Sequence, residues 1–318
     1  MKVCVTGGHG FLGSAVCDAL KAKSIDVISL GRKDGDLLHP MVAEKLLRGC
    51  DTVVHLAADV GGVGYLRSCA GRAFHANFQL GLNIVRTSCR LGVKRLVMAG
   101  TPCAYSGDAT LPLQEDALVQ GVPSGDTGSY GYAKLASSLV SEHFCKDYGV
   151  DTATVIPSNL YGPRDNFDSD KGHVVAALLK KALLAFESNQ DSFSVWGDGA
   201  ATRDFVYVHD VANAIANVVV SKEAHAGTTY NLGSGIETSI REIAHEVASA
   251  VHERMSPKFD SDKPVGYNRR VMSIERARDL LQYEPSTSLK NGLRSTVQWL
   301  RNSGTVDKWL QTERRMAA

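Results

Sequence analysis

Short apolar runs alternate with amphipathic stretches through the first half of this chain. The apolar runs predict strands at residues 2–5, 26–30, 52–56, 95–99 and 151–156, and the stretches between them predict helices at residues 11–22, 41–47, 71–91 and 130–148. Strands rich in Val, Ile and Leu that alternate with helices are typical of a parallel sheet covered on both faces. We therefore expect an α/β fold built on a doubly wound parallel sheet.

The pattern changes after Pro157. Residues 159–171 are rich in Asn, Asp, Gly and Pro and predict a loop, followed by a helix at 174–186 and a strand at 192–195. A strand at 203–210 is expected to lead into a helix at 211–220, residues 230–232 to rejoin the main sheet, and residues from 239 onward to form helices and loops. We expect a first domain of residues 1–165, to which 204–232 return, and a smaller, mostly helical lobe of residues 166–203 and 233–318.

Composition and charge exclude several classes of protein. The formal net charge of +1 gives no field that would attract nucleic acid or a membrane surface. No apolar run approaches the roughly 20 residues that span a bilayer, and the first strand leaves no room for a signal peptide. Seven cysteines without a C-x-x-C pair argue against a disulfide framework or a zinc site. We expect a cytoplasmic protein that needs no metal.

A glycine-rich turn directly follows the first strand and opens the first helix. Gly7, Gly10 and Gly13 form a G-x-x-G-x-x-G pattern, with Phe11 and Leu12 inside it. Glycine lets the backbone turn tightly and approach a pyrophosphate closely, and the helix N-terminus offers free N–H groups to the phosphates. The strand-turn-helix context predicts a Rossmann-type dinucleotide site.

The end of the second strand indicates which dinucleotide binds. NAD enzymes usually place a carboxylate there for the ribose 2′-hydroxyl, whereas this chain has Leu30-Gly31-Arg32-Lys33. Two cations suit a 2′-phosphate, so we expect NADP(H), although an ordinary basic turn would read the same. Asp36 and Leu37 are expected beside the adenine, and Ala57 and Ala58 beside the phosphates.

Tyr130 and Lys134 form a Y-x-x-x-K pair on one face of a predicted helix. An ammonium beside a phenol favours the phenolate, so we expect a lowered tyrosine pKa and proton exchange near neutral pH. Thr101 follows the strand at 95–99 at its carboxyl end, the edge of such sheets where ligands bind. Its hydroxyl is expected to join Tyr130 at the reacting carbonyl.

Together, the glycine turn, Thr101, Tyr130 and Lys134 resemble the extended short-chain dehydrogenase/reductase family over nearly the whole chain. Its nucleotide-sugar members share segments similar to residues 196–199 and 203–210. The stretches at 57–62, 102–105, 156–167 and 172–174 are most similar to the GDP-fucose synthase branch. That branch epimerises C3 and C5 of a GDP-4-keto-6-deoxy sugar and then reduces C4 with NADPH.

The resemblance implies a role for each matching residue. Cys103 and His173 would be the epimerisation acid/base pair, and Thr101, Tyr130 and Lys134 the reduction triad. Without the resemblance, Cys103 would be interpreted more simply as a small buried residue, and His173 as a loop or cap histidine. The resemblance also implies a GDP-sugar substrate and a homodimer. Its further cofactor contacts would be Tyr130, Lys134, Pro157, Asn159, Leu160 and His173, and its substrate contacts Asn159, Lys181, Trp196, Arg203 and Arg270.

Departures from the branch keep alternatives open. Threonine stands at 101 where serine is common, Pro102 replaces a small polar residue, and Val265 stands where aspartate is frequent. A nucleotide-sugar 4-reductase, or a 3,5-epimerase without net reduction, on another sugar or base would fit the same scaffold. A dinucleotide-binding sensor without catalysis is a further alternative, which the retained Thr101, Cys103, Tyr130, Lys134 and His173 disfavour.

Overall fold

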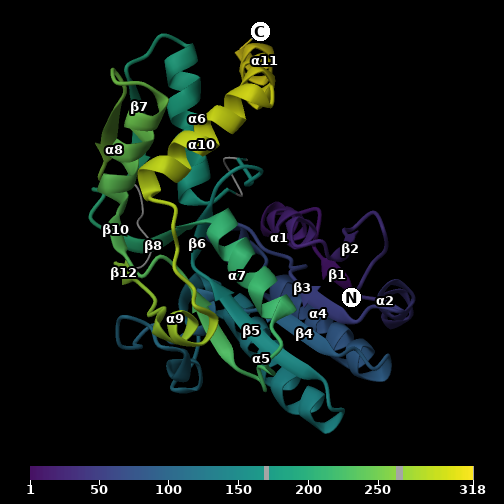
Figure 1. The fold of residues 1–318 in the computed structure, drawn as a ribbon. Helices are drawn as coiled ribbons and strands as arrows, with labels where there is room; N and C mark the ends of the chain where they lie inside the picture. The colour runs from purple at the N-terminus through teal and green to yellow at the C-terminus, as the bar shows by residue number, and fades with distance from the viewer. Residues whose placement is uncertain (168–171, 263–267, 318) are drawn as a thin grey trace.

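The centre of the molecule is a sheet of six parallel strands in the order β2-β1-β3-β4-β5-β9 (Figure 1). The computed structural model describes residues 1–167, 172–262 and 268–317. The predicted doubly wound α/β fold is confirmed. The strands of this sheet are β1 (Lys2–Thr6), β2 (Asp26–Leu30), β3 (Thr52–His55), β4 (Arg95–Ala99), β5 (Asp151–Pro157) and β9 (Thr229–Leu232).

Helices cover both faces of this sheet. Along β1, Val3 and Val5 point to one face and pack with α1 and α7, whereas Cys4 points to the other and packs with α2, α4 and α5. Both sets are almost fully buried, as the period of two along a strand requires. The helices of this part are α1 (Phe11–Ala22), α2 (Pro40–Leu47), α3 (Val63–Ser68), α4 (Ala70–Arg90), α5 (Gly128–Asp147), α7 (Val208–Val220) and α9 (Glu275–Leu281).

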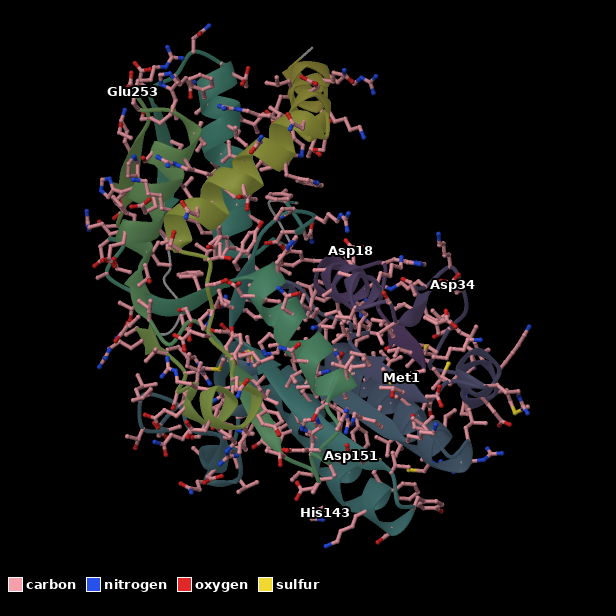
Figure 2. The ribbon with its side chains drawn as sticks, in the orientation of Figure 1. Met1, Asp18, Asp34, His143, Asp151 and Glu253 are labelled. Carbon is pink, nitrogen blue, oxygen red and sulfur yellow. The ribbon has the colours of Figure 1, made fainter. Side chains whose placement is uncertain are left out.

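A second lobe lies beyond the carboxyl ends of the strands (Figure 1). Its core joins the apolar faces of α6 (Val174–Glu187), α8 (Ile240–Val251), α10 (Leu289–Asn302) and α11 (Thr305–Ala317). Two small sheets complete it, one of β6 (Asn159–Tyr161), β8 (Thr202–Tyr207), β10 (Glu237–Ser239) and β12 (Arg269–Arg270), the other of β7 (Ser192–Trp196) and β11 (Ser256–Asp260). In Figure 2, Glu253 and His143 mark the far ends of the second and first lobes.

Several local predictions are wrong. The expected loop at 159–171 contains β6, which pairs with β8, and residues 168–171 lie outside the described residues. The strand expected to reach residue 210 ends at Tyr207, because α7 begins at Val208. The region after 239 contains β11 and β12 as well as helices, and α3 precedes the helix expected at 71–91. Val265 lies outside the described residues.

The division into domains stays a prediction, and one element packs differently from it. The predicted boundary assigns α9 to the second lobe, yet Ile274, Ala277 and Tyr283 are buried in the core formed with α1 and α7. The Tyr283 hydroxyl also donates to the Gly233 carbonyl, just after β9, at 2.9 Å. The last third of the chain therefore contacts both lobes.

None of the helices in the described part of the chain is long and apolar enough to cross a membrane. All seven cysteines are free thiols, and the described residues contain no cluster of metal-binding side chains.

Candidate active site

One large cavity of about 1660 Å³ opens at the carboxyl ends of β1, β3, β4 and β5. It lies where the strand order reverses between β1 and β3, the position at which open α/β sheets bind ligands. The second lobe contributes Arg203 and Arg270 to its lining. The cavity therefore spans from the glycine turn to the interface of the two lobes.

The glycine turn has the geometry that a dinucleotide needs. Gly7 has a φ of +71°, which favours glycine, and a Cβ added at Gly13 would lie 2.0 Å from the Gly7 carbonyl oxygen. Gly10 is the N-cap of α1 and offers no capping side chain, so the helix N-terminus is open toward the cavity that Gly10 lines. These residues fit the pyrophosphate of a dinucleotide.

The loop after β2 supplies the residues expected at the adenosine end. Arg32 is exposed and lines the cavity, as do Asp36 and Leu37. The first carboxylate after β2, Asp34, accepts the Gly31 N–H at 2.8 Å and lies 3.6 Å from the His9 ring. With Asp34 engaged there and Arg32 at the cavity, this loop suits a 2′-phosphate better than a 2′-hydroxyl.

Thr101 and Cys103 are held together by a short 3₁₀ helix, η1 (Pro102–Ala104). Thr101 is its N-cap, and its hydroxyl accepts the Cys103 N–H at 3.3 Å. Arg270, from β12, donates to the Pro102 carbonyl at 2.7 Å and the Tyr105 carbonyl at 3.2 Å. The second lobe thus helps to fix the turn that carries Cys103.

Tyr130 and Lys134 both line the cavity from α5 and are almost fully buried. Burial and the charge of Cys103 raise the pKa of Tyr130, while a hydrogen bond with the Thr101 side chain acts in the opposite direction. The expectation that Lys134 lowers the pKa of Tyr130 is therefore wrong, because desolvation of the phenolate dominates. Burial also lowers the pKa of Lys134 to about 8. A protonated phenol suits the donation of a proton.

Gly131 sets the spacing between α5 and η1. A Cβ at this position would lie 2.0 Å from the Cys103 carbonyl oxygen. Only glycine lets the helix that carries Tyr130 approach the turn that carries Cys103 so closely. A glycine inside a predicted helix is a signal of this kind, although no role was predicted for Gly131.

His173 is the N-cap of α6 and lines the cavity, with 53% of its side chain exposed. Its Nδ1 lies 3.9 Å from Oδ1 of Asp165, whose side chain is buried. The nearby Asp165 carboxylate raises the pKa of His173, against an opposing effect of burial. Asp165 also lines the cavity and was not predicted.

Two guanidinium groups meet at the second-lobe wall. Burial and the positive charge of Arg270 lower the pKa of Arg203, so the two cations lie close enough to repel each other. Both line the cavity. Like charges held together at a cavity wall favour a ligand with two negative groups, such as a diphosphate.

Lys181 and Trp196 lie together, but outside the residues that line the cavity. The Lys181 ammonium is 5.3 Å from the centre of the Trp196 ring and donates to the Ser194 carbonyl at 3.1 Å. Trp196 is 58% exposed and is not part of the buried core of the second lobe. Their role in substrate binding stays a prediction.

The other predicted site residues share the cavity. Asn159, among them, donates its side-chain amide to the Asp204 carbonyl at 2.9 Å. The predicted residues that line the cavity are Gly7, Gly10, Phe11, Leu12, Gly13, Arg32, Asp36, Leu37, Ala57, Ala58, Thr101, Cys103, Tyr130, Lys134, Pro157, Asn159, Leu160, His173, Arg203 and Arg270.

A dinucleotide cradle joined to a buried Thr-Tyr-Lys group in one cavity defines an oxidoreductase of the short-chain dehydrogenase/reductase type. Residues 3–233 match the NAD dependent epimerase/dehydratase family, and the chain belongs to that family. The predicted family resemblance is confirmed.

Two relatives and one solved structure are similar to this chain over nearly its whole length. The chain is 34% identical to GDP-L-fucose synthase of Sinorhizobium fredii (93% of this chain, 94% of the relative) and 31% identical to that of Escherichia coli (94% and 96%). It also resembles the crystal structure of a GDP-L-fucose synthetase from Naegleria fowleri bound to NADP, with a TM-score of 0.83 and 28% identity over 95% of this chain and 93% of that one.

Proposed function

We propose that this chain is an NADPH-dependent epimerase/reductase that converts a GDP-linked 4-keto-6-deoxy sugar, as a GDP-L-fucose synthase does. The observation that carries the proposal is that Thr101, Cys103, Tyr130, Lys134 and His173 line one cavity with the glycine cradle. The relatives named above carry that activity in their names and match over nearly the whole chain.

The cofactor site is composed of residues that suit NADP(H). Gly7, Gly10 and Gly13 would hold the pyrophosphate and Arg32 the 2′-phosphate. The cofactor of the Naegleria fowleri protein is NADP. When bound, NADPH supplies the hydride that reduces the C4 ketone.

Epimerisation requires the removal and return of protons at the carbons beside the ketone. Cys103 and His173 approach the cavity from different elements, η1 and the N-terminus of α6, as exchange on opposite faces of a sugar demands. One group takes a proton, the C–H electrons move into the enolate, and the other returns a proton to the opposite face. The hydroxyls of Thr101 and Tyr130 would stabilise the enolate oxygen.

Reduction uses the same ketone. Because burial raises its pKa, Tyr130 remains a phenol and can donate its proton to the C4 oxygen. The Thr101 side chain hydrogen-bonds Tyr130, and the Lys134 ammonium lies one helical turn away on the same face of α5. Arg203 and Arg270 would hold the diphosphate, which keeps the sugar at this end of the cavity.

The direct test is incubation with GDP-4-keto-6-deoxymannose and NADPH, with product analysis by NMR. We expect one NADPH to be oxidised for each sugar reduced, and a Tyr130→Phe variant to lose at least about 100-fold in rate. An epimerase without reduction would turn over the sugar with no loss of NADPH, and a 4-reductase would leave C3 and C5 unchanged. A non-catalytic sensor would bind NADPH and do neither.

We also propose that the protein is a cytoplasmic homodimer with the predicted domain division. The support is the resemblance to the enzyme branch and, for the dimer, the long helix α4, on which Phe74 is 39% exposed. Sedimentation velocity across a range of concentrations tests the dimer, and a monomer at all concentrations would contradict it.

A further inference from the structure

Asp165 is fixed in the cavity wall by the chain on both sides of it. It follows β6 through a turn in which its N–H meets the Gly162 carbonyl at 3.4 Å and Arg164 takes a φ of +66°. Arg164 points outward to Asp18 of α1 at 2.9 Å. Two residues later, Phe167 is buried between Trp299 and Trp309 of the second lobe. The position of Asp165 is therefore set independently of His173.

The carboxylate of Asp165 has one satisfied and one unsatisfied oxygen. Oδ1 accepts the Asn166 N–H at 2.7 Å, whereas Oδ2 is buried and has no hydrogen-bond donor among the described residues. The side chain is only 3% exposed. A buried charge of this kind is unfavourable unless a donor reaches it. The half-exposed His173 ring, whose Nδ1 lies 3.9 Å from Oδ1, is placed to turn an N–H toward this carboxylate.

We propose that Asp165 is a positioning residue that accepts the Nδ1–H of His173 and thereby turns Nε2 toward the substrate. The inference rests on the proposed function for its meaning, because His173 exchanges a proton with the sugar only if that function holds. Hydrogen bonds of this kind are often long without substrate, and a small rotation of the exposed ring closes this one.

The electrostatic surroundings of His173 agree with this role. As the N-cap of α6, His173 lies at the positive end of a helix, which disfavours an imidazolium. Asp165 is the one charged side chain of the described residues with a resolved effect on the pKa of His173, and it raises it. The other acidic and basic side chains that line the cavity are His9, Arg32, Asp36, Asp59, Arg72, His75, Asp126, Lys134, Arg203 and Arg270.

The first test uses the wild-type protein and needs no substrate. NMR spectra of ¹⁵N-histidine-labelled protein report which ring nitrogen carries the proton. The His173 signals are those missing from a His173→Gln variant, and they are recorded at a pH above the pKa of His173, where the ring is neutral. We expect the Nδ1–H tautomer, because the carboxylate holds that proton. A neutral ring protonated at Nε2 would overturn the proposal whatever the enzyme's substrate is.

The second test is an Asp165→Asn variant, with Asp108→Asn as the matched loss of an exposed carboxylate. We expect the pKa of His173 to fall by about one unit and solvent-proton exchange into the sugar to slow about tenfold or more, while NADPH affinity stays unchanged. Asp108→Asn should change none of these. Unchanged His173 titration in a folded Asp165→Asn protein would show that Asp165 is only structural.

Failure of the two proposals is distinguishable. If the wild-type protein did not convert the GDP-sugar, the proposed function would fail while the tautomer and the titration of His173 still tested Asp165. If the sugar were converted and exchange were equally fast in Asp165→Asn and wild type, the positioning role alone would fail.

Discussion

Lys134 is the residue at which function and stability conflict most directly. Its side chain is buried, and burial lowers its pKa from 10.5 to about 8. The pKa of the buried His55 is lowered to about 3, mainly by burial and secondly by the charge of Lys134. A lysine whose folded pKa is depressed destabilises the fold as long as it is protonated. The destabilisation has its full size below about pH 8 and declines as the pH rises from about 8. It is absent above pH 10.5.

A Lys134→Met variant should therefore be more stable and inactive. Removing the buried ammonium should raise the free energy of unfolding at pH 7 by about 1–3 kcal/mol, because a shift of one pKa unit corresponds to about 1.4 kcal/mol. Urea unfolding at pH 7 and pH 10 measures this, and the gain should shrink at pH 10. Lys146→Met, an exposed change on the same helix, is the control. A destabilised Lys134→Met protein would contradict the argument.

At the scale of elements, the site depends on how closely α5 meets η1. The absence of a side chain at Gly131 makes this close contact possible. A Cβ added at this position would lie 2.0 Å from the Cys103 carbonyl oxygen. The same helix also carries Tyr130 and Lys134, so a shift of α5 moves both relative to Cys103. Displacements of about 1 Å in such sites reduce rates by about 100-fold.

A Gly131→Ala variant should lose catalysis without losing the cofactor. We expect a fall in kcat of at least about tenfold and a loss of stability of about 1–3 kcal/mol from overpacking. NADPH affinity should stay within about twofold, because the glycine cradle is on another element. The matched control is Gly128→Ala in the first turn of α5, whose Cβ would meet its nearest atom at an ordinary 3.4 Å. Equal kcat values for both variants would contradict this account.

The sequence predicted the elements whose signal is local. The short apolar strands, the glycine turn and the Tyr130–Lys134 pair all lie within short windows, and the structure has them where they were expected. β6 was missed because Asn159, Leu160 and Tyr161 form a strand only by pairing with β8, more than 40 residues later. α7 was placed three residues late because the β-branched Val208 is typical of strands.

Asp165 and Gly131 show why the candidate site was only partly predicted. Each acts through one partner, His173 or Cys103, that the fold brings near it. Nothing in the residues next to Asp165 indicates that its carboxylate is buried, since Arg164 beside it is exposed and paired with Asp18. Such roles follow from how separate elements pack against one another, which periodicity and spacing do not reveal.

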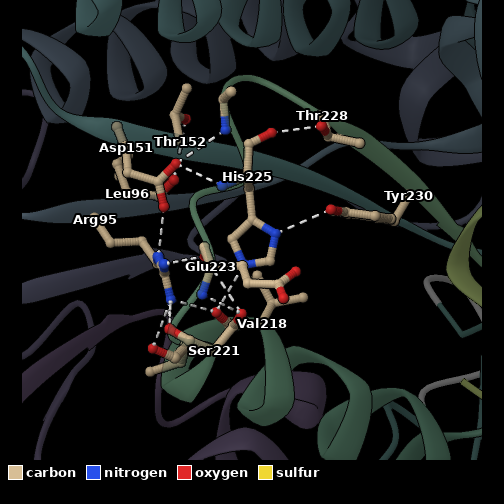
Figure 3. A network of polar contacts seen from close by, with 12 residues as sticks. Arg95, Leu96, Asp151, Thr152, Val218, Ser221, Glu223, His225, Thr228 and Tyr230 are labelled. Atoms are coloured by element: carbon tan, nitrogen blue, oxygen red, sulfur yellow. Dashed lines mark hydrogen bonds and ion pairs between the residues drawn. The ribbon is translucent and has the colours of Figure 1, made fainter. Parts of the chain in front are cut away.

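At the scale of the whole molecule, one partly buried arginine joins segments far apart in sequence. Arg95, at the start of β4, pairs with Asp151 of β5 at 2.7 Å and donates to the carbonyls of Val218, Ser221 and Glu223 at the end of α7 and beyond (Figure 3). Asp151 also accepts the His225 N–H at 2.7 Å. The network lies at the amino ends of the strands, opposite the cavity. By contrast, the ion pair between Arg164 and Asp18 is exposed. Asp18 lies on α1 and is labelled in Figure 2.

An Arg95→Ala variant should be strongly destabilised and still catalytic below its melting temperature. We expect a loss of about 3–5 kcal/mol, because removing the guanidinium leaves a partly buried carboxylate and several carbonyls without their donor. Denaturant unfolding measures the loss, and Arg48→Ala, which breaks an exposed pair with Glu44, should change stability by less than about 1 kcal/mol. Similar losses in the two variants would contradict the assigned importance of the network.

The central claim is that one cavity exchanges protons beside a ketone and then reduces that ketone. Incubation with GDP-4-keto-6-deoxymannose and NADPH in heavy water tests it most directly, with the product analysed by NMR and mass spectrometry. The account predicts deuterium at both C3 and C5, one NADPH oxidised per product, and loss of the deuterium but not of NADPH binding in Cys103→Ser. A reduced product without deuterium at either carbon, or undiminished exchange in Cys103→Ser, would contradict it.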